Sequence, residues 1–213
     1  MTKKSPKKKL INKIGPLEIW SVNGPIIRKN VDPEFTNFGQ HWRFKFIPEN
    51  ELWIDDGDSN EINFFITHLL IERKFMSQGL SYEEALELAD RAERADRFKS
   101  KKFKKAPKDY SKQVKKIKVK KIAAFEDVDV WVVDGELVRD LFYIDFTEGG
   151  HDLVYNFIPE GEVWIDDDVV KGERLYIMLH ELIERRLMEK EKNYQDAHNK
   201  ATKIEWLIRS TND

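Results

Sequence analysis

The chain contains the same sequence twice. Residues 46–56 read FIPENELWIDD, and residues 157–167 read FIPEGEVWIDD, 111 positions later. In a second block, THLLIERKFM at 67–76 corresponds to LHELIERRLM at 179–188. A repeat of this length is too long for a solenoid unit and suits a small domain. The chain is therefore expected to fold as two copies of one structure. Residues shared by both copies serve the fold, and residues specific to one copy mark where function can have diverged.

The composition limits the class of protein. A hydrophobic fraction of 40% is enough for two modest cores, and the charged fraction of 36% exceeds the usual value of about a quarter. The absence of cysteine excludes a disulfide scaffold and thiolate metal sites. The lysine-rich N-terminus is not followed by an apolar signal region, and no apolar stretch is long enough to span a bilayer. The sequence predicts a soluble, cytoplasmic protein without a membrane partner.

Lysines are concentrated in two segments, and these segments divide the chain. Residues 1–13 contain six lysines and no acidic residue, whereas residues 97–121 contain twelve lysines, one arginine and one aspartate. Such segments either solvate a tail and a linker or bind nucleic acid or another anionic partner. The predicted organisation is a basic tail at 1–8, the first copy at 9–97, a lysine-rich linker at 98–119 and the second copy at 120–213.

Each copy is predicted to begin with four strands. Apolar alternation surrounds Asn-Gly at 23–24 and Asp-Gly at 134–135, and these dipeptides are preferred in two-residue hairpin turns. A second hairpin is expected at Pro48 and at Pro159, because proline presets a turn conformation.

Two helices are predicted to follow the strands. Helical periodicity covers residues 60–78 and 172–190, and Ser81 and Asn193 provide N-caps for the helices that come next. Each copy is thus predicted to be a ββββαα unit of the α+β class, with an antiparallel sheet covered on one face by a helical hairpin. The repeat also allows the two copies to pack as an intramolecular pseudo-dimer.

An acidic pair ends the last predicted strand of each copy, at Asp55-Asp56 and at Asp166-Asp167. Paired carboxylates in this place either bind Mg²⁺ or Ca²⁺ or cap backbone amides at a helix N-terminus. Their position at a strand end, just before a helix, favours the capping role.

A histidine and a glutamate recur on the first helix of each copy. His180 and Glu184 are four residues apart and share a helix face, and His68 and Glu72 are their counterparts. A pair common to both copies is explained most simply as a packed, hydrogen-bonded strut. A second pair of equivalent histidines is expected just before the third strand of each copy, at His41 and His151.

Two polar residues near this pair occur in the second copy alone. Glu181 stands where the first copy has Leu69, and His198 stands where it has Leu86. If the helical hairpin turns near residues 189–193, His198 lies almost level with the glutamate of the pair.

These residues form a candidate zinc site. Two imidazoles and one carboxylate are the protein ligands of several catalytic Zn²⁺ sites, which keep a fourth position for water. The predicted ligands are His180, Glu184 and His198, and Glu181 is the predicted general base. His151 and Glu205 are additional candidates.

The order His180-Glu181-x-x-Glu184 followed by His198 resembles the zincins, metalloproteases with HExxH on one helix and a further ligand on a later helix. Because Glu184 stands in place of the second zincin histidine, protease activity does not carry over. The resemblance implies a metal-dependent hydrolase in the second copy and a degenerate site in the first. The alternative is a non-enzymatic module that binds a partner or nucleic acid or belongs to an assembly.

The wider pattern is FIPxxExWID followed by HELIER and YxxAH. It is similar to uncharacterised duplicated-domain proteins of viral and mobile-element genomes. This second resemblance implies no particular activity.

Nucleic-acid binding by the basic segments should be weak, independent of sequence and steeply salt-dependent, because neutralised phosphates release counterions. The candidate contacts are Lys99, Lys101, Lys102, Lys104 and Lys105. Deleting residues 1–8 and replacing the five lysines with glutamine should abolish retardation of a DNA fragment in a low-salt gel. Retardation that persists at moderate salt would place the binding site on a folded copy instead.

Overall fold

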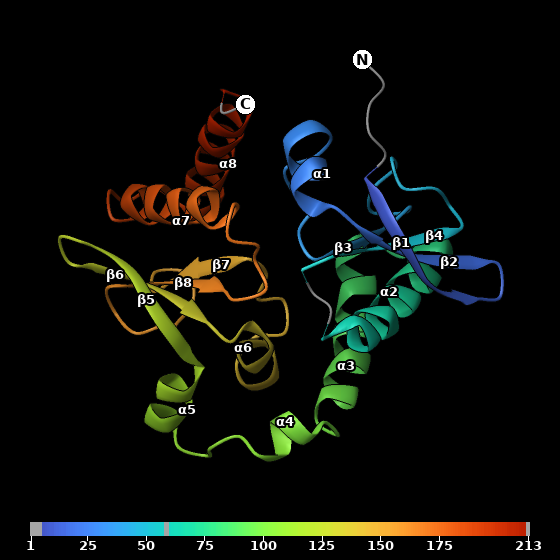
Figure 1. The fold of residues 1–213 in the computed structure, drawn as a ribbon, viewed down its shortest axis with the longest axis horizontal. Helices are drawn as coiled ribbons and strands as arrows, with labels where there is room; N and C mark the ends of the chain where they lie inside the picture. The colour runs from blue at the N-terminus through green and yellow to red at the C-terminus, as the bar shows by residue number, and fades with distance from the viewer. Residues whose placement is uncertain (1–5, 58–59, 212–213) are drawn as a thin grey trace. The chain divides into compact units, whose positions relative to one another are not determined.

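The computed structural model describes residues 6–57 and 60–211, so most of the predicted basic tail at 1–8 lies outside the described residues. The chain divides into two compact units, Met1–Lys104 and Lys105–Asp213, each containing one copy (Figure 1). The units repeat the same order of elements, which confirms the α+β class and the duplication.

In the described residues of the first copy, four strands and three helices are present. The strands are β1 (Lys7–Ile14), β2 (Leu17–Val22), β3 (Phe38–Gln40) and β4 (Glu51–Asp55). The helices are α1 (Gly24–Asn30), α2 (Ile62–Ser77) and α3 (Tyr82–Arg97). The strand order is β1-β2-β4-β3, with β2 and β4 parallel and the other neighbours antiparallel.

The second copy has the same topology. Its strands are β5 (Lys118–Phe125), β6 (Val128–Val133), β7 (Gly149–His151) and β8 (Glu162–Asp166), in the order β5-β6-β8-β7. Its helices are α6 (Gly135–Leu141), α7 (Arg174–Met188) and α8 (Tyr194–Thr211). As in the first copy, the central pair, β6 and β8, is parallel.

The first predicted hairpin of each copy is wrong, and the sheet is mixed instead of antiparallel. The Asn23 side chain accepts a hydrogen bond from Ile26 N at 2.9 Å, and Asp134 accepts one from Leu137 N at 2.9 Å. Asn and Asp before glycine can turn a hairpin, but they are equally suited to cap a helix. Here they begin α1 and α6, and the helical crossover brings the next long strand back parallel.

The second predicted hairpin is also wrong. Residues 43–48 form turns, and β3 lies earlier in the chain than the predicted third strand. Phe44 and Ile47 are buried in a cluster with Trp53. This apolar segment is thus irregular and packs on the sheet. Local sequence periodicity cannot distinguish such a segment from a strand.

The sheet is covered on both faces, whereas one covered face was predicted. Every residue of β4 is buried, and successive side chains point to opposite faces. Leu52 and Ile54 pack with Phe65 and Leu69 of α2. On the opposite face, Trp53 packs with α1 and the segment after it, in a cluster completed by Val22, Ile27, Phe35, Phe44 and Ile47.

Part of the predicted linker belongs to the second unit. It contains two short helices, α4 (Lys101–Lys104) and α5 (Tyr110–Ile117). Val114 and Ile117 are buried in the core of the second unit, so this unit begins well before residue 120.

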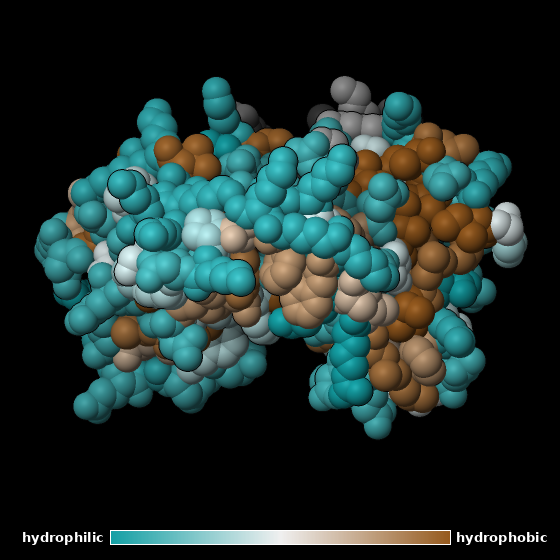
Figure 2. All heavy atoms as spheres, turned by 90° about the horizontal axis from the view of Figure 1, so that it is seen from below, coloured by the Kyte–Doolittle hydropathy of each residue, from teal (hydrophilic) through white to brown (hydrophobic). Residues whose placement is uncertain are grey.

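The surface in Figure 2 is mainly hydrophilic, with hydrophobic residues gathered on the first unit, at the right. The nucleic-acid contact of the lysines remains a prediction.

One member of each acidic pair accepts a hydrogen bond from the start of the short helix that precedes the pair, whereas the predicted cap was for the helix that follows. Asp55 Oδ1 accepts a hydrogen bond from Gly24 N at 3.3 Å, and Asp55 Oδ2 lies 3.1 Å from Arg28 Nη1. Asp167 accepts from Gly135 N at 3.2 Å in the second copy. Each acidic pair therefore links the end of its strand to the N-terminus of the preceding short helix.

Replacing Gly24 with alanine should destabilise the first unit by about 3 kcal/mol or more, because it disrupts a buried ion pair. The new Cβ would lie 1.8 Å from Asp55 Oδ2 and 2.8 Å from Arg28 Nη1. Urea unfolding measures the effect, and Gly172→Ala, whose Cβ meets nothing within 4 Å, is the control. An unchanged midpoint for Gly24→Ala would show that the Asp55–Arg28 pair does not depend on this close approach.

Candidate metal centre

The helical hairpin of the second copy brings the predicted ligands together. His180 and Glu184 lie on α7, and His198 lies on α8. The Asn193 side chain accepts a hydrogen bond from Asp196 N at 2.9 Å and starts α8 one turn before His198. Buried alanines on α8, Ala197 and Ala201, allow the two helices to approach closely.

The three predicted ligand atoms form a triangle suited to zinc. His180 Nε2 lies 3.4 Å from Glu184 Oε2 and 3.3 Å from His198 Nδ1. The third side, from His198 Nδ1 to Glu184 Oε2, is 2.8 Å and has the length of a hydrogen bond. Ligands of a tetrahedral Zn²⁺ at its usual bond lengths are separated by about 3.3 Å. Two sides of the triangle therefore already match this geometry.

Glu205 contacts His180 and belongs to neither cluster of potential metal ligands found among residues 6–57 and 60–211. His180 Nδ1 lies 2.8 Å from Glu205 Oε2, and Glu205 Oε1 accepts from Arg209 Nε at 2.6 Å. Arg209 also pairs with Glu173 at the start of α7. With its Nδ1 proton directed at Glu205, neutral His180 presents the Nε2 lone pair to the site. Metal-binding histidines are commonly oriented by a carboxylate in this way.

His151 is a hydrogen-bond donor to Glu184. Its Nδ1 accepts from Leu153 N at 3.2 Å, so neutral His151 carries its proton on Nε2, which lies 3.1 Å from Glu184 Oε1. A metal on Nε2 would force the proton to Nδ1, facing the Leu153 N–H. In the first copy, Gln40 fills this role, donating from Nε2 to Glu72 Oε1 at 2.7 Å.

The expected equivalence of His41 and His151 is therefore wrong. The last residue of β3 is Gln40, and the last residue of β7 is His151. His41 follows β3, and its Nδ1 lies 2.6 Å from Ile47 O. A shift of one position in matching the copies had concealed that His151, like His198, is specific to the second copy.

Glu181 is close to the ligands but has no partner of its own. Its carboxylate lies within 4.8 Å of the ligand atoms of His151 and Glu184, a distance that one water molecule can bridge. Within residues 6–57 and 60–211, this carboxylate makes no hydrogen bond or ion pair. Burial raises the pKa of Glu181 to about 7.

A glycine allows Glu181 to approach the sheet. A Cβ at position 149 would lie 3.3 Å from Glu181 Cγ and 3.0 Å from the Trp164 carbonyl oxygen. The first copy has Phe38 in this position, and the Phe38 ring lies 4.9 Å from the ring of His68. The space next to the shared histidine is thus apolar in the first copy and holds a carboxylate in the second.

The hydrogen bonds of the site fix the charge of Glu184. Burial opposes its ionisation, but hydrogen bonds from His151, His180 and His198 outweigh burial and hold the pKa of Glu184 well below its usual range. Burial also opposes protonation of His180, whereas hydrogen bonds to Glu184 and Glu205 raise the pKa of His180 to about 10. A metal ion must therefore displace a proton from His180.

The first copy keeps the support of this site but not the ligand set. His68 Nδ1 lies 2.9 Å from Glu93 Oε2, Arg97 Nε donates to Glu93 at 2.7 Å, and Arg97 Nη2 pairs with Glu61 at 2.6 Å. In the described part of the chain, clusters of three potential metal ligands occur only in the second copy.

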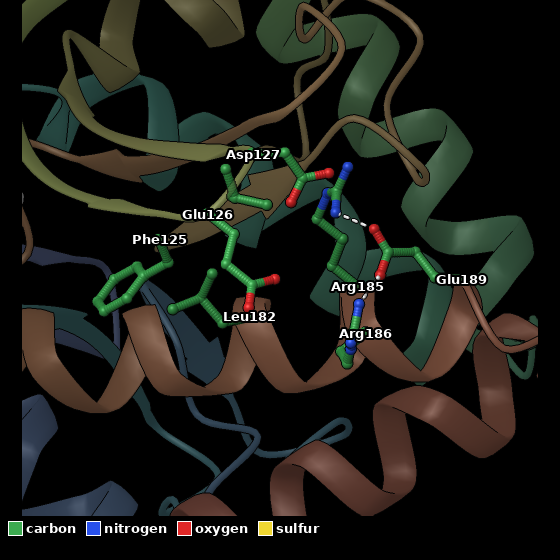
Figure 3. Close-up of a pocket in the computed structure, with 8 residues that line it drawn as sticks. Phe125, Glu126, Asp127, Leu182, Arg185, Arg186 and Glu189 are labelled. Atoms are coloured by element: carbon green, nitrogen blue, oxygen red, sulfur yellow. Dashed lines mark hydrogen bonds and ion pairs between the residues drawn. The ribbon is translucent and has the colours of Figure 1, made fainter.

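A pocket of about 400 Å³ lies on another face of α7, between this helix and the β5–β6 turn (Figure 3). Arg185 and Arg186 both pair with Glu189 at its rim. Arg185 also donates to Asp152, the residue after β7, at 2.7 Å. The residues that line the pocket are Phe125, Glu126, Asp127, Val128, Leu182, Arg185, Arg186 and Glu189. None of them belongs to the candidate metal centre.

No family model, curated protein or solved structure matches this chain. Among residues 6–57 and 60–211, no helix has the length and hydrophobicity needed to cross a bilayer. The two copies therefore provide the comparison on which a functional assignment can be built.

His68 should remain an imidazolium at neutral pH. Burial opposes its protonation, but hydrogen bonds to Glu72 and Glu93 raise the pKa of His68 from 6.5 to about 10. Because the folded-state pKa is the higher one, this stabilisation is complete below about pH 6.5 and is lost as the pH rises towards 10. NMR titration of the ring, assigned with His68→Gln, should show no midpoint between pH 5 and 8. A midpoint near 6.5 would contradict the assignment.

Proposed function

We propose that the second copy binds one divalent metal ion, with Zn²⁺ the best fit, and uses it to hydrolyse a bound substrate. The proposed ligand atoms are His180 Nε2, Glu184 Oε2 and His198 Nδ1. The observation that carries this proposal is that three polar residues specific to the second copy, His151, Glu181 and His198, cluster with one shared His–Glu pair.

The first copy shows that the fold does not require these polar groups. Leucines occupy the positions of Glu181 and His198 in the first copy, and Leu69 is fully buried in its core. Burying polar groups in place of leucine is unfavourable unless they find partners. A bound cation supplies such a partner and explains why these substitutions occur together.

The donor set favours zinc over magnesium or calcium. Imidazole nitrogens suit Zn²⁺, whereas Mg²⁺ and Ca²⁺ prefer sites made of oxygen ligands. Three protein ligands also leave one position open, as in catalytic zinc sites. Glu181 does not join His180 and His198 in one cluster, which supports a role outside the ligand set.

A Zn²⁺ ion held by His180, Glu184 and His198 would supply Lewis acidity that makes water nucleophilic at neutral pH. Glu181 would serve as the general base that takes a proton from water and passes it to the leaving group. His151 holds Glu184 through its Nε2 proton, while Glu205 and Arg209 hold His180. Hydrolysis leaves the hydroxyl group of the water on one fragment of the substrate and its proton on the other.

The first copy supplies variants that should fold. Calorimetry should show one Zn²⁺ bound per chain, and His198→Leu, the residue of the first copy, should weaken binding by at least about 100-fold. The matched control is Leu86→Ala, at the position of the first copy equivalent to His198, which should leave zinc affinity unchanged. Absence of zinc uptake by the unaltered protein would leave His180 and Glu184 as a structural strut. Uptake of two ions would assign a second site to His151, Glu181 and Glu184.

Glu181→Gln separates catalysis from metal binding. It should keep the zinc affinity, since Glu181 is not a ligand, and should slow hydrolysis of 4-nitrophenyl acetate by roughly 10²–10⁴-fold. If the zinc-loaded protein hydrolyses this ester no faster than His198→Leu does, the metal centre is not catalytic and the binding-module alternative holds.

A further inference from the structure

Two adjacent side-chain bridges join the end of β7 to α7 in the second copy. In the first bridge, His151 Nε2 donates to Glu184 Oε1 at 3.1 Å. In the second, the next residue of each element takes part, and Asp152 accepts from Arg185 Nε at 2.7 Å and from Arg185 Nη2 at 3.1 Å. The side chains of Asp152 and Arg185 are only 4% and 8% exposed. Consecutive residues at the strand end thus contact consecutive residues of the helix.

The second bridge is the more rigid of the two. An arginine that donates to both oxygens of a carboxylate fixes the relative orientation of the two groups as well as their separation. The aspartate is also held from its other side, because Asp152 Oδ2 accepts from Gly161 N at 2.7 Å and Asp152 N donates to Glu162 O at 3.2 Å. The second bridge therefore ties three segments together: the end of β7, the start of β8 and the middle of α7.

The first copy lacks the second bridge. His41 stands in place of Asp152, and Arg73 is the counterpart of Arg185. Arg73 Nη2 donates to Glu49 O at 2.9 Å, and its buried Nε has no hydrogen-bond partner in the part of the chain that the structure describes. The arginine is thus common to both copies, whereas its carboxylate partner is specific to the second copy, like the polar residues of the candidate metal centre.

The second bridge bears on the metal centre through the first bridge. β7 has three residues and lies at the edge of its sheet, so few backbone hydrogen bonds hold it. If its end moved away from α7, His151 would release Glu184 Oε1. The Glu184 carboxylate would then be free to rotate, and Oε2 would lose its fixed direction towards the two ligand histidines.

We propose that Asp152 is a positioning residue for the candidate metal centre. Its pair with Arg185 keeps the end of β7 against α7, so that His151 holds Glu184 in the orientation of a metal ligand. Neither Asp152 nor Arg185 belongs to a cluster of potential ligands among residues 6–57 and 60–211, so both act through other residues. This inference rests on the proposed metal centre.

Zinc affinity, measured by calorimetry, tests the assignment. Asp152→Asn keeps the size of the side chain and removes its charge, and it should weaken Zn²⁺ binding about 10-fold, as for other residues that hold metal ligands. If the melting curve shows that this variant does not fold, Asp152→His replaces it, because the first copy folds with His41 beside Arg73. Glu189→Gln is the control. Glu189 pairs with Arg185 from α7 itself, so its loss leaves the link to β7 and the zinc affinity unchanged.

A double-mutant cycle separates positioning from a general loss of stability. In the His151→Leu protein the first bridge is already absent, so adding Asp152→Asn should cost no further zinc affinity. Independent, additive losses of affinity would show that Asp152 does not act through His151, and they would overturn the inference.

The two proposals fail in different ways. Equal zinc affinity in the unaltered protein and in Asp152→Asn would overturn the positioning role and leave the metal centre intact. Absence of zinc uptake by the unaltered protein would contradict the metal centre itself, and the role of Asp152 would fall with it.

Discussion

A buried chain of charges holds the helical hairpin of each copy, and the rest of the structure depends on it. In the first copy it runs from Glu61 through Arg97 and Glu93 to His68, and all four residues are buried. Removing one member would leave another charge buried without a partner, which is strongly destabilising. The chain therefore fixes how the two helices are aligned. It does so equally in the second copy, where the same helices carry the candidate ligands.

Because this support is shared, the second copy can differ in chemistry without differing in backbone. Four substitutions between the copies surround one constant His–Glu pair. The second copy has Glu181 and His198 in place of leucines, His151 in place of Gln40 and Gly149 in place of Phe38. Several of these substitutions depend on one another. The glycine makes room for the carboxylate, and the two histidines hold Glu184 from opposite sides. The differences thus form one coordinated set.

The sequence predicted the relative positions of residues in the helical hairpin better than the pairing of the strands. The alignment of Glu184 with His198 followed from the rise per residue of an antiparallel helical hairpin. The parallel strand pair could not be predicted, because Asn23-Gly24 suits both a hairpin turn and a helix start. The role of His151 was obscured because β7 is only three residues long and offers little pattern for matching the copies.

The first copy already holds a cation where the second is proposed to hold a metal. In the first copy this cation is the ring proton of His68, surrounded by the carboxylates of Glu72, Glu93 and Asp90. Protons are always supplied by water, whereas transition metals are scarce and their supply varies. If the second copy holds a metal as proposed, metal starvation would remove its chemistry and leave the first copy folded, because His68 draws its proton from water.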